Sequence, residues 1–183
     1  FLINQAKGID DSVVDSTTYI PKGISNEITL DKDINQKELL YPYLMSLCES
    51  ISIRLRNQKK YASVICVILK DNYFKRKSHQ KKLTNATNIT NEIYNISKQI
   101  LDEMWNDDSI RLIGVRLDKL VENINYQASL FDEDNTKEES KVDNVLDDLK
   151  KKYGNSIINK ARLVNNKAKK KIDLKNDIKK KRK

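Results

Sequence analysis

The sequence predicts an α+β fold of the split β-α-β-β-α-β, ferredoxin-like type, with one sheet and both helices on the same face. Three observations predict it. Two stretches, beginning near Asn35 and at Thr90, carry apolar residues at helical spacing. Residues 64–69 form a continuous, β-branched apolar run with the length of a central strand. The other apolar stretches alternate with polar residues, as strands with one exposed face do.

The first half of this fold is expected to contain a strand, a helix and a second strand. Residues 23–30 alternate in period two and form the first strand. The first helix covers 35–57, and Pro42 leaves two alternatives there. Either the helix begins near Tyr41 with the proline at its first position, or the proline kinks it. The central strand at 63–69 follows.

The second half is expected to add a hairpin partner, a helix and a last strand. A turn signal at 71–72 precedes residues 74–83, which are polar and basic and predict a strand with one wet, positive face. Thr90 is a suitable N-cap for the second helix. Residues 109–120 form the last strand, so the order of elements is complete within about 100 residues.

Charge divides the chain after this domain. Residues 121–150 carry nine acidic and three basic side chains, whereas residues 151–183 carry 14 basic and two acidic ones. Val142, Val145 and Leu149 recur at helical spacing near the end of the acidic region. The expected organisation is a domain at 21–121, an acidic linker at 122–139, a short helical segment at 140–165 and a disordered basic tail at 166–183.

Composition excludes several classes of protein. The chain has 183 residues, a formal net charge of +9 and 33% charged residues. No apolar run approaches the roughly 18 residues that span a bilayer, and two cysteines cannot form a disulfide framework. A membrane protein, a secreted disulfide scaffold and a large enzyme within this chain are therefore excluded. The chain begins with Phe1 rather than Met, so we expect it to be part of a longer protein.

The residue types that carry catalysis or bind metals are sparse. His79 is the only histidine and has no cysteine pair near it, so no zinc site is expected. Cys48 and Cys66 fall on predicted core faces, as small buried hydrophobes do. The four glycines form no phosphate-binding loop, and the paired carboxylates lie at helix ends or on charged faces. We therefore predict no catalytic or metal-binding residues in this chain.

The basic residues favour nucleic acid as the partner. An open sheet face lined by side chains such as Arg76, Lys77, Arg111 and Arg116 suits contacts to a phosphate backbone. An RNA-recognition module has the same order of elements, but it stacks bases on aromatics of its third strand. The third strand predicted here has none between residues 75 and 82. Backbone contacts are therefore the favoured interpretation.

Several segments resemble, in the same order, the C-terminal part of Y-family, DinB-type translesion DNA polymerases. Residues 22–30, KGISNEITL, resemble the opening of the little-finger domain of that family, and 71–83 resemble its hairpin. Residues 110–117, IRLIGVRL, resemble its last strand. Residues 8–12, GIDDS, resemble the close of the thumb, and 127–131, QASLF, resemble a sliding-clamp motif.

This resemblance implies a function for the longer protein and a role for this piece of it. The whole enzyme would be an error-prone, Mg²⁺-dependent DNA polymerase of DNA repair and lesion bypass. Its catalytic palm would precede Phe1, so this piece needs no cofactor of its own and should be inactive alone. Residues 1–20 would close the thumb, and 21–121 would form the little finger. The implied partners are primer–template DNA and the bacterial sliding clamp, for a monomer in the bacterial cytoplasm with no membrane contact.

Two groups of site residues follow from the basic face and the resemblance. Backbone amides near Ser25 and side chains of the later strands would contact DNA phosphates, and an apolar pair with a glutamine would bind the clamp. The predicted DNA-binding residues are Lys22, Ile24, Ser25, Asn26, Arg76, Lys77, Ser78, Arg111 and Arg116. The predicted clamp-binding residues are Gln127, Leu130 and Phe131.

Three alternatives remain open at this point. Arg111 and Arg116 would contact no phosphate if they form surface salt bridges with the helices. Leu130 and Phe131 would bind no clamp if they pack back onto the domain. The whole chain would be no part of a polymerase if it is a free-standing nucleic-acid-binding adaptor with a ferredoxin-like fold and no catalytic activity.

Overall fold

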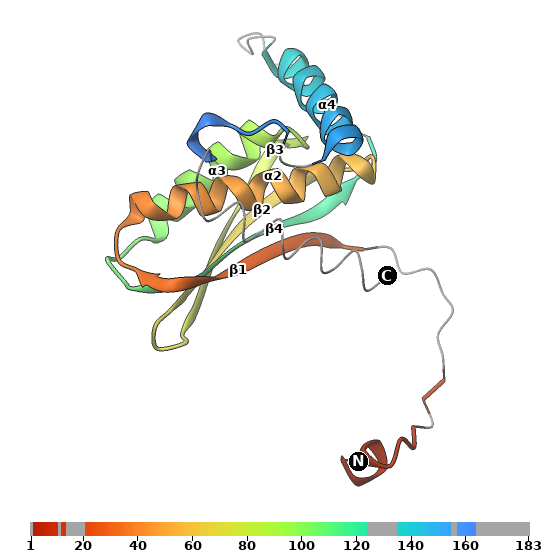
Figure 1. The fold of residues 1–183 in the computed structure, drawn as a ribbon, viewed down its shortest axis with the longest axis vertical. Helices are drawn as coiled ribbons and strands as arrows, with labels where there is room; N and C mark the ends of the chain where they lie inside the picture. Colours follow the sequence, from red (N-terminus) through yellow and green to blue (C-terminus); the bar gives the residue numbers. More distant parts are fainter. Residues whose placement is uncertain (1, 11, 14–20, 124–134, 155–156, 164–183) are drawn as a thin grey trace.

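The structure is a computed structural model that describes residues 2–10, 12–13, 21–123, 135–154 and 157–163 (Figure 1). Its centre is a four-stranded sheet, with helices in a layer above it. The elements in chain order are α1 (Leu2–Ala6), β1 (Gly23–Ile34), the 3₁₀-helix η1 (Lys37–Leu40), α2 (Tyr41–Asn57), β2 (Tyr61–Asp71), β3 (Arg76–Thr87), α3 (Thr90–Met104), β4 (Ile110–Val121), α4 (Asn135–Tyr153) and the 3₁₀-helix η2 (Ala161–Leu163).

The strands lie in the order β1-β4-β2-β3, and every neighbouring pair is antiparallel. Each helical connection therefore passes over one strand: β4 lies between β1 and β2, and β2 lies between β3 and β4. The sequence predicted the order of the elements along the chain but not this order of strands within the sheet. The two outer strands, β1 and β3, each pair with a single described strand.

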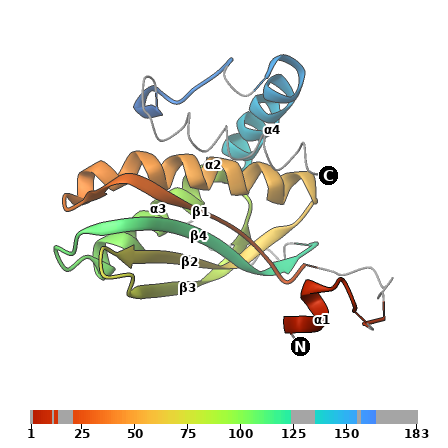
Figure 2. The ribbon, with the colours of Figure 1, turned by 60° about the horizontal axis from the view of Figure 1, so that its bottom comes forward.

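Helices α2 and α3 cover the same face of the sheet (Figure 2). Helix α2 contacts β1 and β4, and α3 contacts β2 and β3. The core lies between the two layers. Side chains with 0% exposure from both layers fill it, among them Leu44, Leu47 and Ile51 of α2, Ile93 and Ile100 of α3, and Ile65, Ile113 and Leu117 of the sheet. The predicted α+β fold with both helices on one face is confirmed.

The structure decides between the two alternatives for Pro42. Helix α2 begins at Tyr41, and the proline occupies its first turn, where no intrahelical partner for its missing N–H is required. Residues 37–40 form a separate 3₁₀ turn before it rather than the first turn of one long helix. The proline therefore marks the start of the helix and does not kink it.

A further helix, α4, lies on the outer side of the helical layer, away from the sheet (Figures 1 and 2). The sequence predicted a helical segment from residue 140, and the helix begins at Asn135. After it, Leu163 of η2 is buried to 2% exposure in the main hydrophobic core. This C-terminal part therefore packs on the domain instead of leaving it as a separate unit. The predicted basic tail, 166–183, lies outside the described residues.

Candidate nucleic-acid interface

The sheet face opposite α2 and α3 has no described helix over it, and we call it the open face. Strand pairing sets its side chains in rows, because residues directly opposite one another in an antiparallel pair point to the same side. One row runs Ser25, Arg116, Cys66 and Gln80 across the four strands. The neighbouring row runs Glu27, Gly114, Ile68 and Ser78, and the next runs Thr29, Leu112, Lys70 and Arg76.

The middle of the open face is apolar, and its border is charged. Val64, Cys66 and Ile68 of β2 are only 2–5% exposed although they lie outside the main core. Long polar side chains of the neighbouring strands therefore lie over them. Burial raises the pKa of the Cys66 thiol, and the charges of Arg116, Asp118 and Arg76, which border the apolar middle, act on it too.

Gly114 is required at the centre of the open face. A Cβ built there would lie 2.8 Å from the Cβ of Glu27 on the neighbouring strand, which is closer than packed carbon atoms approach. The absence of a side chain at Gly114 lets Glu27 lie across β4. The carboxylate of Glu27 then receives Arg76 from the far side of the sheet, at 3.2 Å between Oε2 and Nη2.

Four of the predicted DNA-binding residues meet on the open face. Register places Ser25, Arg76, Ser78 and Arg116 there, drawn from three strands. Arg111 lies at the end of the sheet near the β2–β3 turn, where its guanidinium is 5.0 Å from the centre of the Phe74 ring. Lys22 is exposed just before β1. These six residues are positioned to meet a ligand on the open side or at its borders.

Three predicted DNA-binding residues point the other way. Ile24 and Asn26 are 2% and 3% exposed on the helix side of β1, where the Asn26 amide donates to Ser50 Oγ at 3.2 Å. Only their backbone groups remain for a phosphate. Lys77 also faces the helical layer, and its ammonium pairs with Asp108. The third strand offers no apolar alternation, so the sequence could not show which of Arg76 and Lys77 faces outward.

The arginines near the open face each have a carboxylate partner. Arg76 pairs with Glu27, Arg116 Nε lies 2.6 Å from Asp118 Oδ2, and Arg111 Nη1 lies 3.7 Å from Asp33 Oδ1. The hydrogen bond to Asp118 raises the pKa of Arg116 further above its already high value. The partners of Arg111 and Arg116 are strand residues and not the helices that the sequence alternative named. Exposed pairs of this kind contribute little to stability, so a phosphate can replace the carboxylate.

Sequence reasoning missed three cations of this region. Register places Lys70 and Lys82 on the open face, at its two ends. Arg54, on α2, donates from Nη1 to the Ser25 carbonyl at 3.1 Å and so sets a cation beside β1. Lys82 follows Arg76 by six residues on the same strand, so period two relates these two cations, but no spacing along the chain relates Lys70 or Arg54 to Arg76 or Arg116. Strand pairing and helix docking bring them together.

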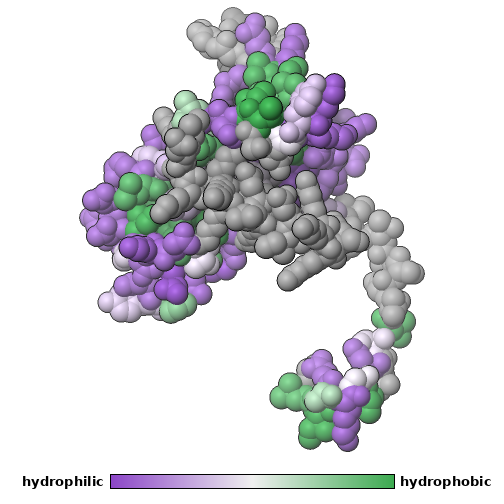
Figure 3. All heavy atoms as spheres, viewed as in Figure 1, coloured by the Kyte–Doolittle hydropathy of each residue, from purple (hydrophilic) through white to green (hydrophobic). Residues whose placement is uncertain are grey.

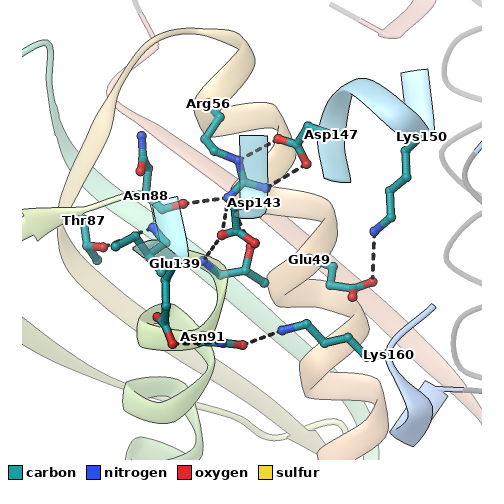
Figure 4. A network of polar contacts seen from close by, with 12 residues as sticks. Glu49, Arg56, Thr87, Asn88, Asn91, Glu139, Asp143, Asp147, Lys150 and Lys160 are labelled. Carbon is teal, nitrogen blue, oxygen red and sulfur yellow. Dashed lines mark hydrogen bonds and ion pairs between the residues drawn. The ribbon is translucent and has the colours of Figure 1, made fainter. Parts of the chain in front are cut away.

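A second polar cluster lies far from the open face, where α4 meets α2 and α3 (Figure 4). Arg56 of α2, 7% exposed, makes a bidentate contact with Asp147 at 2.6 and 2.9 Å and a third bond to Asp143 at 3.0 Å. Asp143 also accepts from the backbone N–H of Thr90 at 2.8 Å, which satisfies a free donor at the start of α3. These contacts hold α4 on the helical layer.

The predicted clamp motif cannot be placed, and the described part of the chain holds neither a metal-binding cluster nor a membrane-spanning helix. Gln127, Leu130 and Phe131 of the predicted clamp motif lie outside the described residues. Among the residues that the structure describes, no three His, Cys, Asp or Glu side chains gather as a metal ion would need. No described helix is both long and apolar enough to cross a bilayer. In the view of Figure 3 the described surface is mostly hydrophilic, with a hydrophobic patch over α4.

The open cationic face on a four-stranded α+β domain defines a protein class suited to binding a polyanion. Residues 21–130 match the model of the impB/mucB/samB family C-terminal domain. The chain belongs to this family. It is similar to the DNA polymerase IV of Clostridium acetobutylicum, with 38% identity over 159 residues that cover 87% of this chain and 40% of that protein. The DNA polymerase IV of Clostridium kluyveri is 30% identical over 169 residues, covering 87% and 42%.

A solved structure shares the fold at low sequence identity. A chimera of the Y-family DNA polymerases Dbh and Dpo4 superposes with a TM-score of 0.51 and 21% identity, over 67% of this chain and 35% of that one. The family match and the DNA polymerase IV relatives confirm the predicted resemblance to the C-terminal part of a DNA polymerase IV-like enzyme. The chain spans about two fifths of the length of the curated relatives it matches.

Proposed function

We propose that this chain is the DNA-binding, little-finger part of a DNA polymerase IV-like translesion enzyme, and that its open face holds primer–template DNA by the phosphate backbone. The observation that carries the proposal is the convergence of Lys70, Arg76, Lys82 and Arg116 on one sheet face in a chain of this family. Glu27 and Asp118 are the carboxylates that register places among these cations.

The chemistry of the open face favours contacts that ignore base sequence. Arginine and lysine heads bind phosphate oxygens, which are the same at every nucleotide. A polymerase that acts at any lesion needs a grip of this kind. Relatives named as DNA polymerases favour this proposal over the free-standing adaptor.

Binding of the full chain to blunt duplex DNA, followed by fluorescence anisotropy between 50 and 200 mM salt, tests the proposal. Arg111 and the four cations of the open face would neutralise about five phosphates, so log K should fall against log salt with a slope of about −4 to −5. Two duplexes of unrelated sequence should bind equally. A slope near zero, or a strong preference for one sequence, would contradict it.

We further propose that residues 127–131 bind the bacterial sliding clamp, with Leu130 and Phe131 as apolar anchors and Gln127 as a hydrogen-bonding partner. The support is their resemblance to the clamp motif and their place directly after the domain. Replacing both anchors, Leu130→Ala with Phe131→Ala, should cost about 2–4 kcal/mol of clamp binding and leave duplex DNA binding unchanged. Equal clamp binding by the double variant and the parent would remove this role.

The chemistry of nucleotide addition is proposed for the whole enzyme only. The resemblance implies that the Mg²⁺ of such a polymerase is held by its catalytic palm. This chain should therefore extend no primer when supplied with nucleotides and Mg²⁺, and extension would contradict the proposal. We expect it to act as a monomer, in the bacterial cytoplasm where its DNA lies.

A further inference from the structure

Two aromatic side chains stand exposed at the turn between β2 and β3. Tyr73 is 86% exposed and Phe74 60% exposed, although both are large and apolar enough to be buried elsewhere. In Figure 1 this hairpin projects past the rest of the sheet, on the side away from α4. The third strand itself has no Phe, Trp or Tyr, whereas Phe74 of this pair lies close to the heads of Lys70 and Arg111.

Hydrogen bonds from within the turn and from the start of β4 fix its backbone. Asp71 accepts the backbone N–H of Lys75 on its side chain at 2.8 Å and the backbone N–H of Phe74 on its carbonyl at 3.1 Å. The Asn72 N–H donates to the Ser109 carbonyl at 3.0 Å, which ties the turn to the start of β4. Phe74 has a φ of 65°, a left-handed conformation that bulky residues rarely adopt. Such geometry, held by surrounding bonds, is often found at functional sites.

Cations surround the aromatic pair. The Lys70 ammonium lies 4.8 Å and the Arg111 guanidinium 5.0 Å from the centre of the Phe74 ring. Phe74 thus holds two positive heads near the tip, where they can meet backbone phosphates. Asp33 pairs with Arg111, and the Asp71 carboxylate is used inside the turn. Tyr73 is left as an aromatic side chain open to solvent beside this positive cluster.

We propose that Tyr73 stacks on the first unpaired base of single-stranded DNA next to the duplex, while Lys70 and Arg111 bind phosphates at the duplex end beside that base. This inference rests on the proposed DNA-binding function and refines it. Inside a duplex the base faces are covered by their neighbours, whereas an unpaired base offers a face to an aromatic ring. A tip that combines a free ring with adjacent cations has the chemistry that single-strand binding uses. The open face would hold duplex, and the tip would meet the strand beyond it.

The test compares blunt duplex with a duplex that carries a short single-stranded overhang, using the full chain. The parent should bind the overhang probe more tightly than the blunt one. Tyr73→Ala should weaken binding to the overhang probe by about 5- to 150-fold and leave blunt binding unchanged. Tyr73→Phe keeps the ring and should retain the preference. A 2-aminopurine in the overhang should be quenched by the parent and by Tyr73→Phe, but not by Tyr73→Ala.

Tyr153→Ala is the matched control. Tyr153 is also an exposed tyrosine with a lysine head 5.1 Å from its ring, but it lies on α4. This variant should bind both probes as the parent does. Stacking is overturned if the parent shows no preference for the overhang, if Tyr73→Ala keeps it, if Tyr73→Phe loses it, or if Tyr153→Ala loses it too. Failure of the parent to bind blunt duplex would instead overturn the proposed function.

Discussion

Arg76 on β3 and Glu27 on β1 form an ion pair across the whole width of the sheet, with 3.2 Å between Nη2 and Oε2. The two strands are its outer edges, so the pair passes over β4 and β2. It lies on the face where DNA is proposed to bind. Glu27 is therefore an internal competitor for the guanidinium that a phosphate would use.

Replacing this carboxylate should strengthen DNA binding. Glu27→Gln removes a negative charge that repels phosphates and leaves Arg76 available to them. We expect duplex affinity to rise by about 2- to 10-fold at low salt, as a rim charge typically acts on association. Anisotropy titrations measure it, with Glu92→Gln on α3 as the control for charge loss on the helical side. Unchanged or weaker binding by Glu27→Gln would show that the pair does not face the DNA.

Gly114 should tolerate no side chain. Gly114→Ala would force a Cβ to within 2.8 Å of the Glu27 Cβ, so β1 and β4 must shift. Such overpacking costs about 1–3 kcal/mol, which a lower urea midpoint would record. Ser78→Ala, on the same row of the open face, should change stability by less than about 0.5 kcal/mol. If Gly114→Ala unfolds at the same urea concentration as the parent, Glu27 does not lie as close to Gly114 as the structure has it.

The Arg56 cluster should control whether α4 stays on the domain. Asp147→Asn weakens a bidentate, charge-assisted contact to a guanidinium that is 7% exposed. The docked state of α4 should lose about 1.5–3 kcal/mol, seen as faster amide hydrogen exchange in α4 while the central strands keep their protection. Asp148→Asn removes the same charge from the neighbouring, exposed position and should exchange as the parent does. Equal exchange in both variants would mean that Arg56 does not hold the helix.

Stability should fall at alkaline pH, and the buried thiol of Cys48 should contribute to that fall. Burial between α2 and α3 raises the pKa of Cys48 from 9.0 to about 12. The folded state therefore keeps its proton in a range where the unfolded chain loses it. The contribution of Cys48 to the free energy of unfolding is fully present below about pH 9. It is lost as the pH rises toward 12, at about 1.4 kcal/mol per pH unit. Urea midpoints between pH 8 and 10.5 should fall more steeply for the parent than for Cys48→Ala. If the urea midpoints of the parent and of Cys48→Ala fall equally steeply with pH, the Cys48 thiol makes no such contribution.

The sequence predicted the elements well where apolar residues repeat. Ile24, Ile28 and Leu30 alternate in β1, and all three lie in the core. Pro42 left two alternatives for α2, a start near Tyr41 or a kink, and the structure has the start at Tyr41. The helical spacing of Val142 and Val145 indicated α4, yet both side chains are more than half exposed. What attaches α4 is a set of charged residues whose spacing gave no signal.

Register could not be predicted for the strands that matter most to the site. Residues 64–69 of β2 are apolar at every position, because this strand is buried on both faces, so periodicity cannot assign a side. Strand β3 is polar throughout. Only its pairing with β2, Lys70 opposite Arg76 and Leu69 opposite Lys77, decides which cation faces outward. A shift of one residue would exchange them.

Arg76 and Lys77, neighbours on β3 that face opposite sides of the sheet, provide the most direct test that the open face binds DNA. Arg76→Gln and Lys77→Gln remove one charge each from adjacent positions, and both residues have a carboxylate partner. Duplex binding should weaken with Arg76→Gln, and the slope of log K against log salt should become shallower by about 1. Lys77→Gln should bind as the parent does. Equal losses in both variants, or a loss only with Lys77→Gln, would contradict the account.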